Sequence, residues 1–122
     1  MSKILLVDDD VKSCELLENF FEMKGHDVIM AYSGMQAFEM AQGEKPDITL
    51  LDTSTLGTDG IEVLMRMRES DRNMGIIMLT AAKDKEAAKD ALKVGADDYI
   101  TKPVNYALLE SKIVSCLMKR KK

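Results

Sequence analysis

The sequence predicts an α/β fold, a doubly wound, five-stranded parallel sheet with helices on both faces. Short runs of branched apolar residues alternate with segments of helical periodicity along the whole chain. The runs are apolar without interruption, which is typical of strands that are buried on both faces of a parallel sheet. The spacing between runs leaves room for one helix per crossover, and such crossovers are right-handed.

The first predicted strand, residues 3–7, is an unbroken apolar run that ends in acidic residues. From residue 11 to residue 21 apolar residues recur at helical spacing; Asp10 can cap this helix, and Gly25 ends it. Residues 28–32 form the second predicted strand, which is again short and apolar.

Ser33 and Gln36 have the spacing of a capping box, and they open a helix that ends before Gly43. Residues 48–52 form the third predicted strand. A turn of Pro and Asp precedes that strand. Residues 53–60 are expected to form a loop.

The second half of the chain repeats the alternation. A helix follows from residue 61, and residues 76–80 form the fourth predicted strand. An Ala- and Lys-rich helix covers about 84–94, and residues 99–101 form a short fifth strand. Asn105 can cap a final helix with one apolar face. We expect the flavodoxin-like strand order 2-1-3-4-5.

The composition indicates one ordinary globular domain over residues 1–122. The chain is long enough to bury one core, with 46% hydrophobic and 31% charged residues. A net charge of -4 disfavours nucleic acid as a direct partner. The basic run 119–122 is interpreted as a helix end, whose cations suit the helix dipole, with a linker as the alternative.

Targeting and cysteine patterns predict a cytoplasmic protein without structural disulfides. No apolar stretch approaches the ~18 residues of a membrane span, and the N-terminus has no signal-peptide layout. Cys14 and Cys116 lie among periodic apolar residues and are expected to be core thiols, not disulfide or zinc ligands. The ten methionines are interpreted as core filler with some adaptable surface.

Polar side chains follow four of the five predicted strands at the point where each strand ends. They are Asp8-Asp9-Asp10, Asp52, Thr80 and Lys102. In doubly wound sheets, ligands bind outside the carboxyl ends of the strands. We therefore expect these side chains to form one site. Taken singly they would be unremarkable: a helix cap (Asp10), a turn residue (Asp52), a strand end (Thr80) and a surface lysine (Lys102).

The chemistry of this cluster favours phosphoryl transfer. Carboxylates this close repel one another unless a cation compensates, and Mg²⁺ with oxygen ligands suits that role. Lys102 can pair with a phosphoryl oxygen, and the Thr80 hydroxyl can donate a hydrogen bond to it. Asp52 is then the carboxylate placed to attack phosphorus and form an aspartyl phosphate.

The chain resembles the receiver domain of two-component response regulators over essentially its whole length. The motifs that carry the resemblance are Leu-Leu-Val-Asp8-Asp9, Pro46-Asp47-x-x-Leu-Leu-Asp52, Asp59-Gly60, Met-Leu-Thr80-Ala81, Gly95-Ala96-Asp97-Asp98-Tyr99 and Lys102-Pro103. The resemblance implies that Asp52 accepts a phosphoryl group from a histidine kinase or a phosphotransfer protein.

The resemblance also implies the remaining roles. Asp9 would bind Mg²⁺ directly, Asp8 largely through water, and the Ser54 backbone carbonyl and Asp52 would complete the protein's metal ligands; Mn²⁺ can substitute. Lys102 and Thr80 would hold phosphoryl oxygens. On phosphorylation Thr80 and Tyr99 would move inward and remodel the face formed by strand four, the helix after it and strand five. The Lys102-Pro103 bond is expected to be cis.

The sequence departs from the family pattern after the acceptor. Leu56 stands where proline is usual and Thr55 where methionine is usual, so we expect a more mobile loop. Ser54 and Ala82 occupy the two positions that help to place the hydrolytic water in the family. Neither has a carboxylate or amide, which predicts slow self-dephosphorylation.

Three alternative functions are considered. A phosphohydrolase would need a second aspartate two residues after the nucleophile, where this chain has Ser54. A flavin carrier would need a phosphate cradle after the first strand, where carboxylates stand instead. A receiver-like module without phosphorylation would not need all of these site residues. His26 follows a helix end and is expected to lie outside the site.

The output and the oligomeric state stay open. The chain could be a free-standing shuttle that docks on a partner, or part of a regulator with an attached effector domain. It could be a monomer or a phosphorylation-dependent dimer.

Overall fold

The five strands pair in parallel in the order β2-β1-β3-β4-β5, which confirms the predicted fold class and strand order. The computed structural model describes residues 2–56 and 60–120. The strands are β1 (Lys3–Val7), β2 (Asp27–Ala31), β3 (Ile48–Asp52), β4 (Gly75–Thr80) and β5 (Asp98–Thr101). The central β1, β3 and β4 are apolar and almost wholly buried, as the uninterrupted apolar runs predict.

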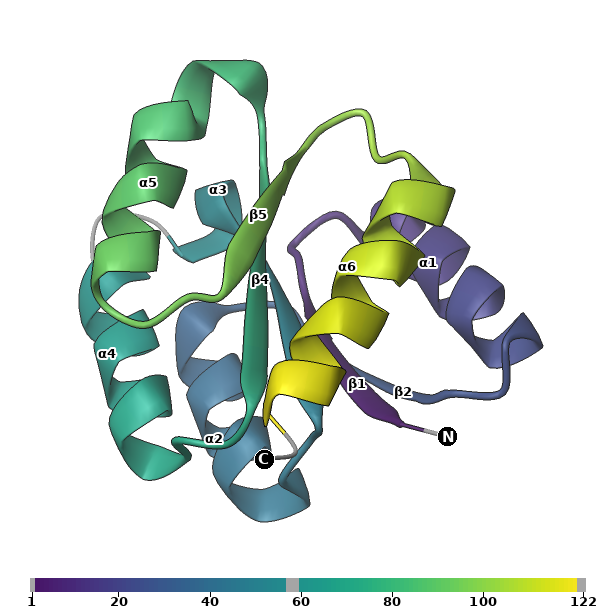
Figure 1. Cartoon of the computed structure of the whole chain (residues 1–122), viewed down its shortest axis with the longest axis horizontal. Coiled ribbons are helices and arrows are strands. Elements are labelled where there is room, and N and C mark those ends of the chain that lie inside the picture. The colour runs from purple at the N-terminus through teal and green to yellow at the C-terminus, as the bar shows by residue number, and fades with distance from the viewer. Residues whose placement is uncertain (1, 57–59, 121–122) are drawn as a thin grey trace.

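Helices cover both faces of the sheet (Figure 1). They are α1 (Val11–Met23), α2 (Gly34–Glu44), α3 (Thr53–Leu56), α4 (Gly60–Ser70), the short 3₁₀ turn η2 (Ala82–Asp84), α5 (Lys85–Lys93) and α6 (Tyr106–Arg120). Two buried clusters show the division between the faces. Helices α2, α4 and α5 pack on one face, and α1 and α6 pack on the other.

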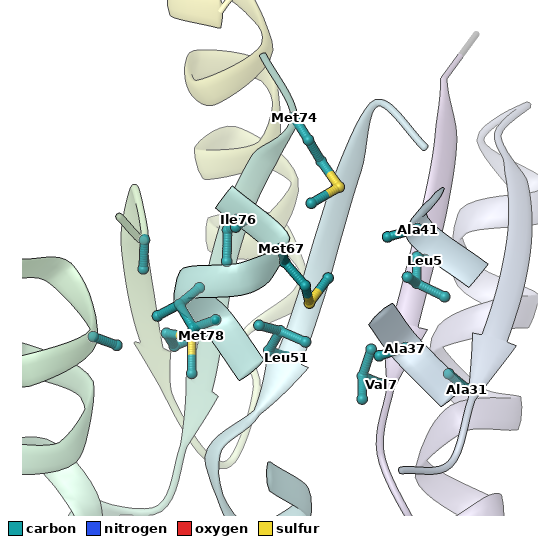
Figure 2. Packing of buried hydrophobic residues seen from close by; sticks show 13 residues of the cluster. Leu5, Val7, Ala31, Ala37, Ala41, Leu51, Met67, Met74, Ile76 and Met78 are labelled. Atoms are coloured by element: carbon teal, nitrogen blue, oxygen red, sulfur yellow. The ribbon is translucent and has the colours of Figure 1, made fainter. Parts of the chain in front are cut away.

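Methionines fill much of the core on the α2–α4–α5 face. Met67, Met74 and Met78 are at most 2% exposed, and their sulfur atoms lie around Leu51 and Ile76 in Figure 2. The α2 alanines of the same cluster, Ala37 and Ala41, lie beside Leu5 and Val7 in Figure 2. Other methionines are exposed, so the prediction of core filler with some surface use is confirmed.

The predicted helix caps are confirmed. The Asp10 carboxylate accepts hydrogen bonds from the backbone amides of the first turn of α1. Ser33 Oγ accepts from Gln36 N at 3.1 Å, and the Gln36 side chain reaches back to the Tyr32 amide. Asn105 Oδ1 accepts from the Leu108 amide at 3.0 Å. Each cap fixes the direction in which a helix leaves the sheet.

The expected loop at 53–60 is the main error in the predicted elements. Its first four residues form the helical turn α3, which begins directly after Asp52. Thr and Ser are unfavourable in helix interiors, so local propensity does not predict α3. The turn is stabilised instead by tertiary contacts that the local sequence does not reveal. Asp59 lies outside the described residues, and the greater mobility expected of this loop stays a prediction.

Smaller differences concern element boundaries. Strand β2 begins and ends one residue earlier than predicted, because Asp27 pairs with Lys3 and its amide bonds to Ser2 O. The predicted helix at 84–94 is preceded by the turn η2. Cys14 and Cys116 are buried free thiols, as expected. No helix among the described residues is long and apolar enough to cross a membrane.

Candidate functional site at the carboxyl edge of the sheet

Parallel pairing brings the predicted site residues to one edge of the sheet. Asp52 is the last residue of β3, and Asp8 directly follows β1, its neighbour in the sheet. Thr80 ends β4 on the other side of β3, and Lys102 directly follows β5. The Lys102 amide bonds to Thr80 O at 2.8 Å and so extends the strand ladder into the site.

The centre of the site is an ion pair between Asp52 and Lys102. Lys102 Nζ lies 2.7 Å from Asp52 Oδ2 and 4.0 Å from Asp8 Oδ2. Asp8 is 4% exposed and Asp52 is 3% exposed, so two carboxylates are buried beside one ammonium. The Lys102-Pro103 peptide bond is cis, as the family resemblance implies. The group of Asp8, Asp52 and Lys102 therefore contains one more acidic side chain than basic side chains.

Burial and charge separate the two carboxylates. Burial raises the pKa of Asp8 to about 6, and the nearby Asp52 charge adds to this, although the Asp10 amide and Lys102 oppose it. Burial alone would also raise the pKa of Asp52, but hydrogen bonds from Lys102 and Ser54 outweigh it and lower that pKa. The Asp52 partnership likewise raises the pKa of Lys102 against the effect of burial. Asp52 is thus held ionised, as a nucleophile must be.

Both carboxylate oxygens of Asp52 have partners. Oδ2 accepts from Lys102, and Oδ1 accepts from the Ser54 amide and the Ser54 hydroxyl, each at 3.0 Å. The helical turn α3 allows both Ser54 contacts because it brings the Ser54 amide and hydroxyl back toward the Asp52 carboxylate. The sequence predicts a role only for the Ser54 backbone carbonyl, so the contact of the Ser54 side chain with Asp52 was not predicted.

Thr80 lies fully buried on β4, beside β3. Its hydroxyl donates to Ala81 O at 3.3 Å and accepts from the Thr53 hydroxyl at 3.3 Å. Tyr99 lies near the start of β5, where it is half-buried and packs against the core of the α2–α4–α5 face. Ala82 is exposed and begins η2. Of the two predicted switch residues, Thr80 is therefore at the site edge and Tyr99 is on the neighbouring face.

Oxygen ligands suitable for Mg²⁺ gather on the Asp8 side of the site. Asp8 and Asp52 are brought together, whereas the Asp9 side chain is exposed at the same edge. Within residues 2–56 and 60–120, no three His, Cys, Asp or Glu side chains form a ready-made metal cluster. Two buried carboxylates with incomplete neutralisation, plus an exposed carboxylate, nevertheless fit a hard cation that takes only part of its ligands from protein.

Sequence reasoning missed the side-chain contacts of the hydroxyl run after Asp52. Besides the contacts of Thr53 and Ser54, the Thr55 hydroxyl accepts a hydrogen bond from the Asp9 amide at 3.0 Å. The signal was the run itself, because three consecutive hydroxyl residues directly follow a strand-end aspartate. His26, as expected, lies outside the site; its Nδ1 accepts from the Ser2 amide at 3.3 Å.

Comparisons with known proteins agree with this geometry. A family model described as "Response regulator receiver domain" matches residues 4–114. The alkaline phosphatase synthesis transcriptional regulatory protein PhoP of Bacillus subtilis is 41% identical over 116 residues, which cover 94% of this chain and 48% of that protein. The chain therefore spans about half the length of this curated relative.

Solved structures are similar over the whole fold. A response regulator receiver domain protein from Clostridium thermocellum has a TM-score of 0.92 at 25% identity, covering 99% of this chain and 98% of that one. The receiver domain of Francisella response regulator 1452 has a TM-score of 0.84 at 33% identity and covers 100% of both chains. These likenesses extend across the strand ends that carry the site.

Proposed function

The chain belongs to the response regulator receiver domain family, and on that premise we propose that Asp52 is the residue that accepts a phosphoryl group. The observation that carries the proposal is the Lys102 Nζ contact of 2.7 Å to Asp52 Oδ2, made beside the buried Asp8 carboxylate. An ionised carboxylate next to an ammonium, at the open edge of a sheet, is suited to attack on phosphorus. We propose that residues 1–122 act as one receiver unit.

In the proposed reaction, an Asp52 carboxylate oxygen attacks the phosphorus of a phosphohistidine. The new P–O bond replaces the P–N bond, and the histidine nitrogen leaves with the bonding pair and takes up a proton. Lys102 exchanges its contact with Asp52 for one with a phosphoryl oxygen, and Thr80 donates a hydrogen bond to another. The receiver carries out only its own phosphorylation and dephosphorylation, so it has no separate substrate to turn over.

Mg²⁺ is the proposed cofactor, with Mn²⁺ as a substitute. Asp8, Asp9, Asp52 and the Ser54 backbone carbonyl would hold it, and when bound it would neutralise charge on the phosphoryl oxygens. The excess negative charge of the Asp8–Asp52–Lys102 cluster supports this assignment.

The proposed output is a change in the face formed by β4, α5 and β5. Thr80 would turn toward the phosphoryl group, and Tyr99 would turn inward behind it. Thr80 ends β4, and Tyr99 lies on the paired strand β5, where it packs half-buried against the α2–α4–α5 face; this placement on adjacent strands supports the proposed coupling. A histidine kinase or phosphotransfer protein is the proposed donor, and a docking partner or an attached effector domain receives the signal. We propose a cytoplasmic location.

The decisive experiment is intact-mass measurement after incubation with acetyl phosphate and Mg²⁺. The wild type should gain one phosphoryl group, and Asp52→Ala should gain none. No gain in the wild type, or an equal gain in Asp52→Ala, would refute the proposal. Turnover of an added phosphate monoester would instead favour the phosphohydrolase alternative.

Slow loss of the phosphoryl group is part of the proposal. Ser54 and Ala82 offer no carboxylate or amide to orient a water molecule. Ser54→Asn should therefore shorten the phosphoryl lifetime several-fold, which intact mass against time after donor removal would reveal. A lifetime of only seconds in the wild type would contradict it.

A further inference from the structure

The Thr55 hydroxyl joins two segments that are far apart in the sequence. It accepts a hydrogen bond from the Asp9 amide at 3.0 Å, across a separation of 46 residues. Asp9 lies in the acidic segment Asp8-Asp9-Asp10 between β1 and α1, whereas Thr55 lies on α3, directly after the acceptor strand. The bond therefore connects the segment that follows β3 and Asp52 with the acidic segment that follows β1.

We propose that Thr55 is a positioning residue that holds this acidic segment in place for Mg²⁺. The inference rests on the proposed function, in which Asp8 and Asp9 bind the metal. Thr55 itself needs no contact with the cation, because it acts through the backbone of Asp9.

The other amides of the acidic segment bond on their own side of the site. The Asp8 amide donates to Ala31 O at 3.1 Å in the neighbouring strand, and the Asp10 amide donates to Asp8 Oδ1 at 2.9 Å. Asp10 is in turn occupied as the cap of α1. Of these three amides, the Asp9 amide is the donor that reaches α3. Thr55 thus supplies a restraint that the β1–α1 connection does not supply itself.

The chemical reason is that only a side chain with an acceptor can make this bond. A threonine at position 55 offers a hydroxyl, whereas an apolar residue there would leave the Asp9 amide to water. The next residue is Leu56, so α3 lacks the fixed φ that a proline would give at that position. The hydrogen bond between the Thr55 hydroxyl and the Asp9 amide restrains α3 instead.

Pre-organisation determines the expected size of the effect. Without the bond, the acidic segment samples more conformations, and binding of Mg²⁺ must order them. One neutral hydrogen bond of this kind corresponds to a change in affinity of about three- to tenfold. We expect Thr55→Val, which keeps the shape and removes the acceptor, to weaken Mg²⁺ binding by that factor. Thr55→Ser, which keeps the hydroxyl, should stay within about twofold of the wild type.

The test is calorimetric titration of the unphosphorylated protein with Mg²⁺ for the wild type, Thr55→Val and Thr55→Ser. Amide hydrogen exchange, measured by NMR without divalent cations, provides a readout independent of metal. The Asp9 amide should exchange more slowly in the wild type and in Thr55→Ser than in Thr55→Val. Melting temperatures of the three proteins separate this local effect from a loss of overall stability.

Each outcome has a defined meaning. Weaker binding and faster Asp9 exchange in Thr55→Val alone support the inference. Equal affinities in all three proteins overturn it, as does an equal loss in both variants, which would assign the effect to packing of the methyl group. A wild type that binds no Mg²⁺ overturns the metal assignment of the proposed function itself, and the inference falls with it.

Discussion

The two ends of the sheet carry ionic clusters of opposite balance. At the carboxyl end, Asp8 and Asp52 share the ammonium group of Lys102. At the amino end, Asp97 alone lies between Arg68 and Arg120, with Asp97 Oδ2 3.2 Å from Arg68 Nη2 and Oδ1 3.0 Å from Arg120 Nε. One cluster therefore has an excess of negative charge and the other an excess of positive charge.

The excess guanidinium donors at the amino end are satisfied by backbone carbonyls. Arg68 donates to Gly95 O at 3.0 and 2.8 Å, and also to Asp71 O and Met74 O. Arg120 donates to Arg72 O at 2.7 Å. Several of these carbonyls lie just after α4, where the helix dipole favours cations. This cluster joins α4, the β4–β5 edge and α6, so we interpret it as structural.

Within residues 2–56 and 60–120, the excess carboxylate at the carboxyl end has no comparable compensation. The Asp8 carboxylate accepts a hydrogen bond from the Asp10 amide, but burial still raises the pKa of Asp8 to about 6. A group whose charged form is disfavoured in the free protein is stabilised by a ligand that supplies positive charge. We interpret the amino end as a stabilising cluster. Under the proposed Mg²⁺ assignment, the carboxyl end is less stable without the cation because its charges are arranged to bind it.

The largest expected effect is at the amino end. Arg68→Ala should lower the free energy of unfolding by about 2–4 kcal/mol, since it removes the donor to the part-buried Gly95 and Met74 carbonyls and one of the two guanidinium partners of Asp97. Arg66→Ala is the matched control on the same helix. Its ion pair with Glu62 is exposed, and its loss should cost less than about 0.5 kcal/mol. Urea denaturation measures both, and equal losses would contradict the assignment of a structural role to Arg68.

At the carboxyl end, removal of a charge should have the opposite sign. Asp8→Asn should stabilise the Mg²⁺-free protein at neutral pH by about 1–2 kcal/mol, because it removes a buried carboxylate that lacks sufficient compensation. The asparagine oxygen can still accept from the Asp10 amide. Urea denaturation without divalent cations measures the change.

Mg²⁺ should reverse the order of stability of the wild type and Asp8→Asn. The wild type should be stabilised by saturating Mg²⁺, while Asp8→Asn should respond far less. If Mg²⁺ stabilised both equally, Asp8 would not belong to the metal site.

The pH dependence of the free energy of unfolding should also reflect the buried Asp8 carboxylate, with a smaller effect. The folded protein binds a proton at Asp8 with a pKa of about 6, above its ordinary value of 3.8, so lowering the pH from 7 to 5 favours the folded state. The gain should be about 1 kcal/mol without divalent cations. Protonation of Asp52, whose pKa is lowered, destabilises the folded state, but only at pH values near and below its ordinary pKa of 3.8. Parallel pH profiles of the wild type and Asp8→Asn would contradict the assignment to Asp8.

Sequence reasoning reached the site more easily than the amino-end cluster, for a physical reason. Asp8, Asp52, Thr80 and Lys102 each interrupt a buried apolar run, and parallel pairing brings such interruptions to one edge. The contacts of Arg68 and Arg120 join exposed-looking helix positions to loops. Periodicity cannot distinguish such an arginine from a solvated one.

The hydroxyl run after Asp52 shows a second limit of sequence reasoning. The predicted loop is instead the turn α3, and the Thr55 contact with Asp9 spans 46 residues. Local propensity disfavours Thr and Ser in a helix, so a prediction from propensity alone gives a loop. The tertiary contacts of the hydroxyls override that preference, and they depend on a sheet register that no single segment encodes.

The two cysteines allow the ends to be compared in one experiment. Cys14 Sγ lies 3.5 Å from Asp8 O at the carboxyl end, whereas Cys116 lies beside Asp97 at the amino end. Burial, followed by the nearby carboxylates, raises the pKa of each thiol to about 11, so neither should react quickly with a disulfide reagent in the folded protein. Their reaction therefore reports local opening.

Asp97→Asn should accelerate labelling of Cys116 about fivefold, as expected for a local loss of about 1 kcal/mol, and leave Cys14 nearly unchanged. Mass spectrometry of peptides after timed labelling assigns the rate to each cysteine, so Cys14 serves as the internal control. Equal acceleration at both sites would mean that the ends open together. The amino-end cluster would then stabilise the whole fold and not only its own edge, and the division between a structural and a binding end would apply to charge alone.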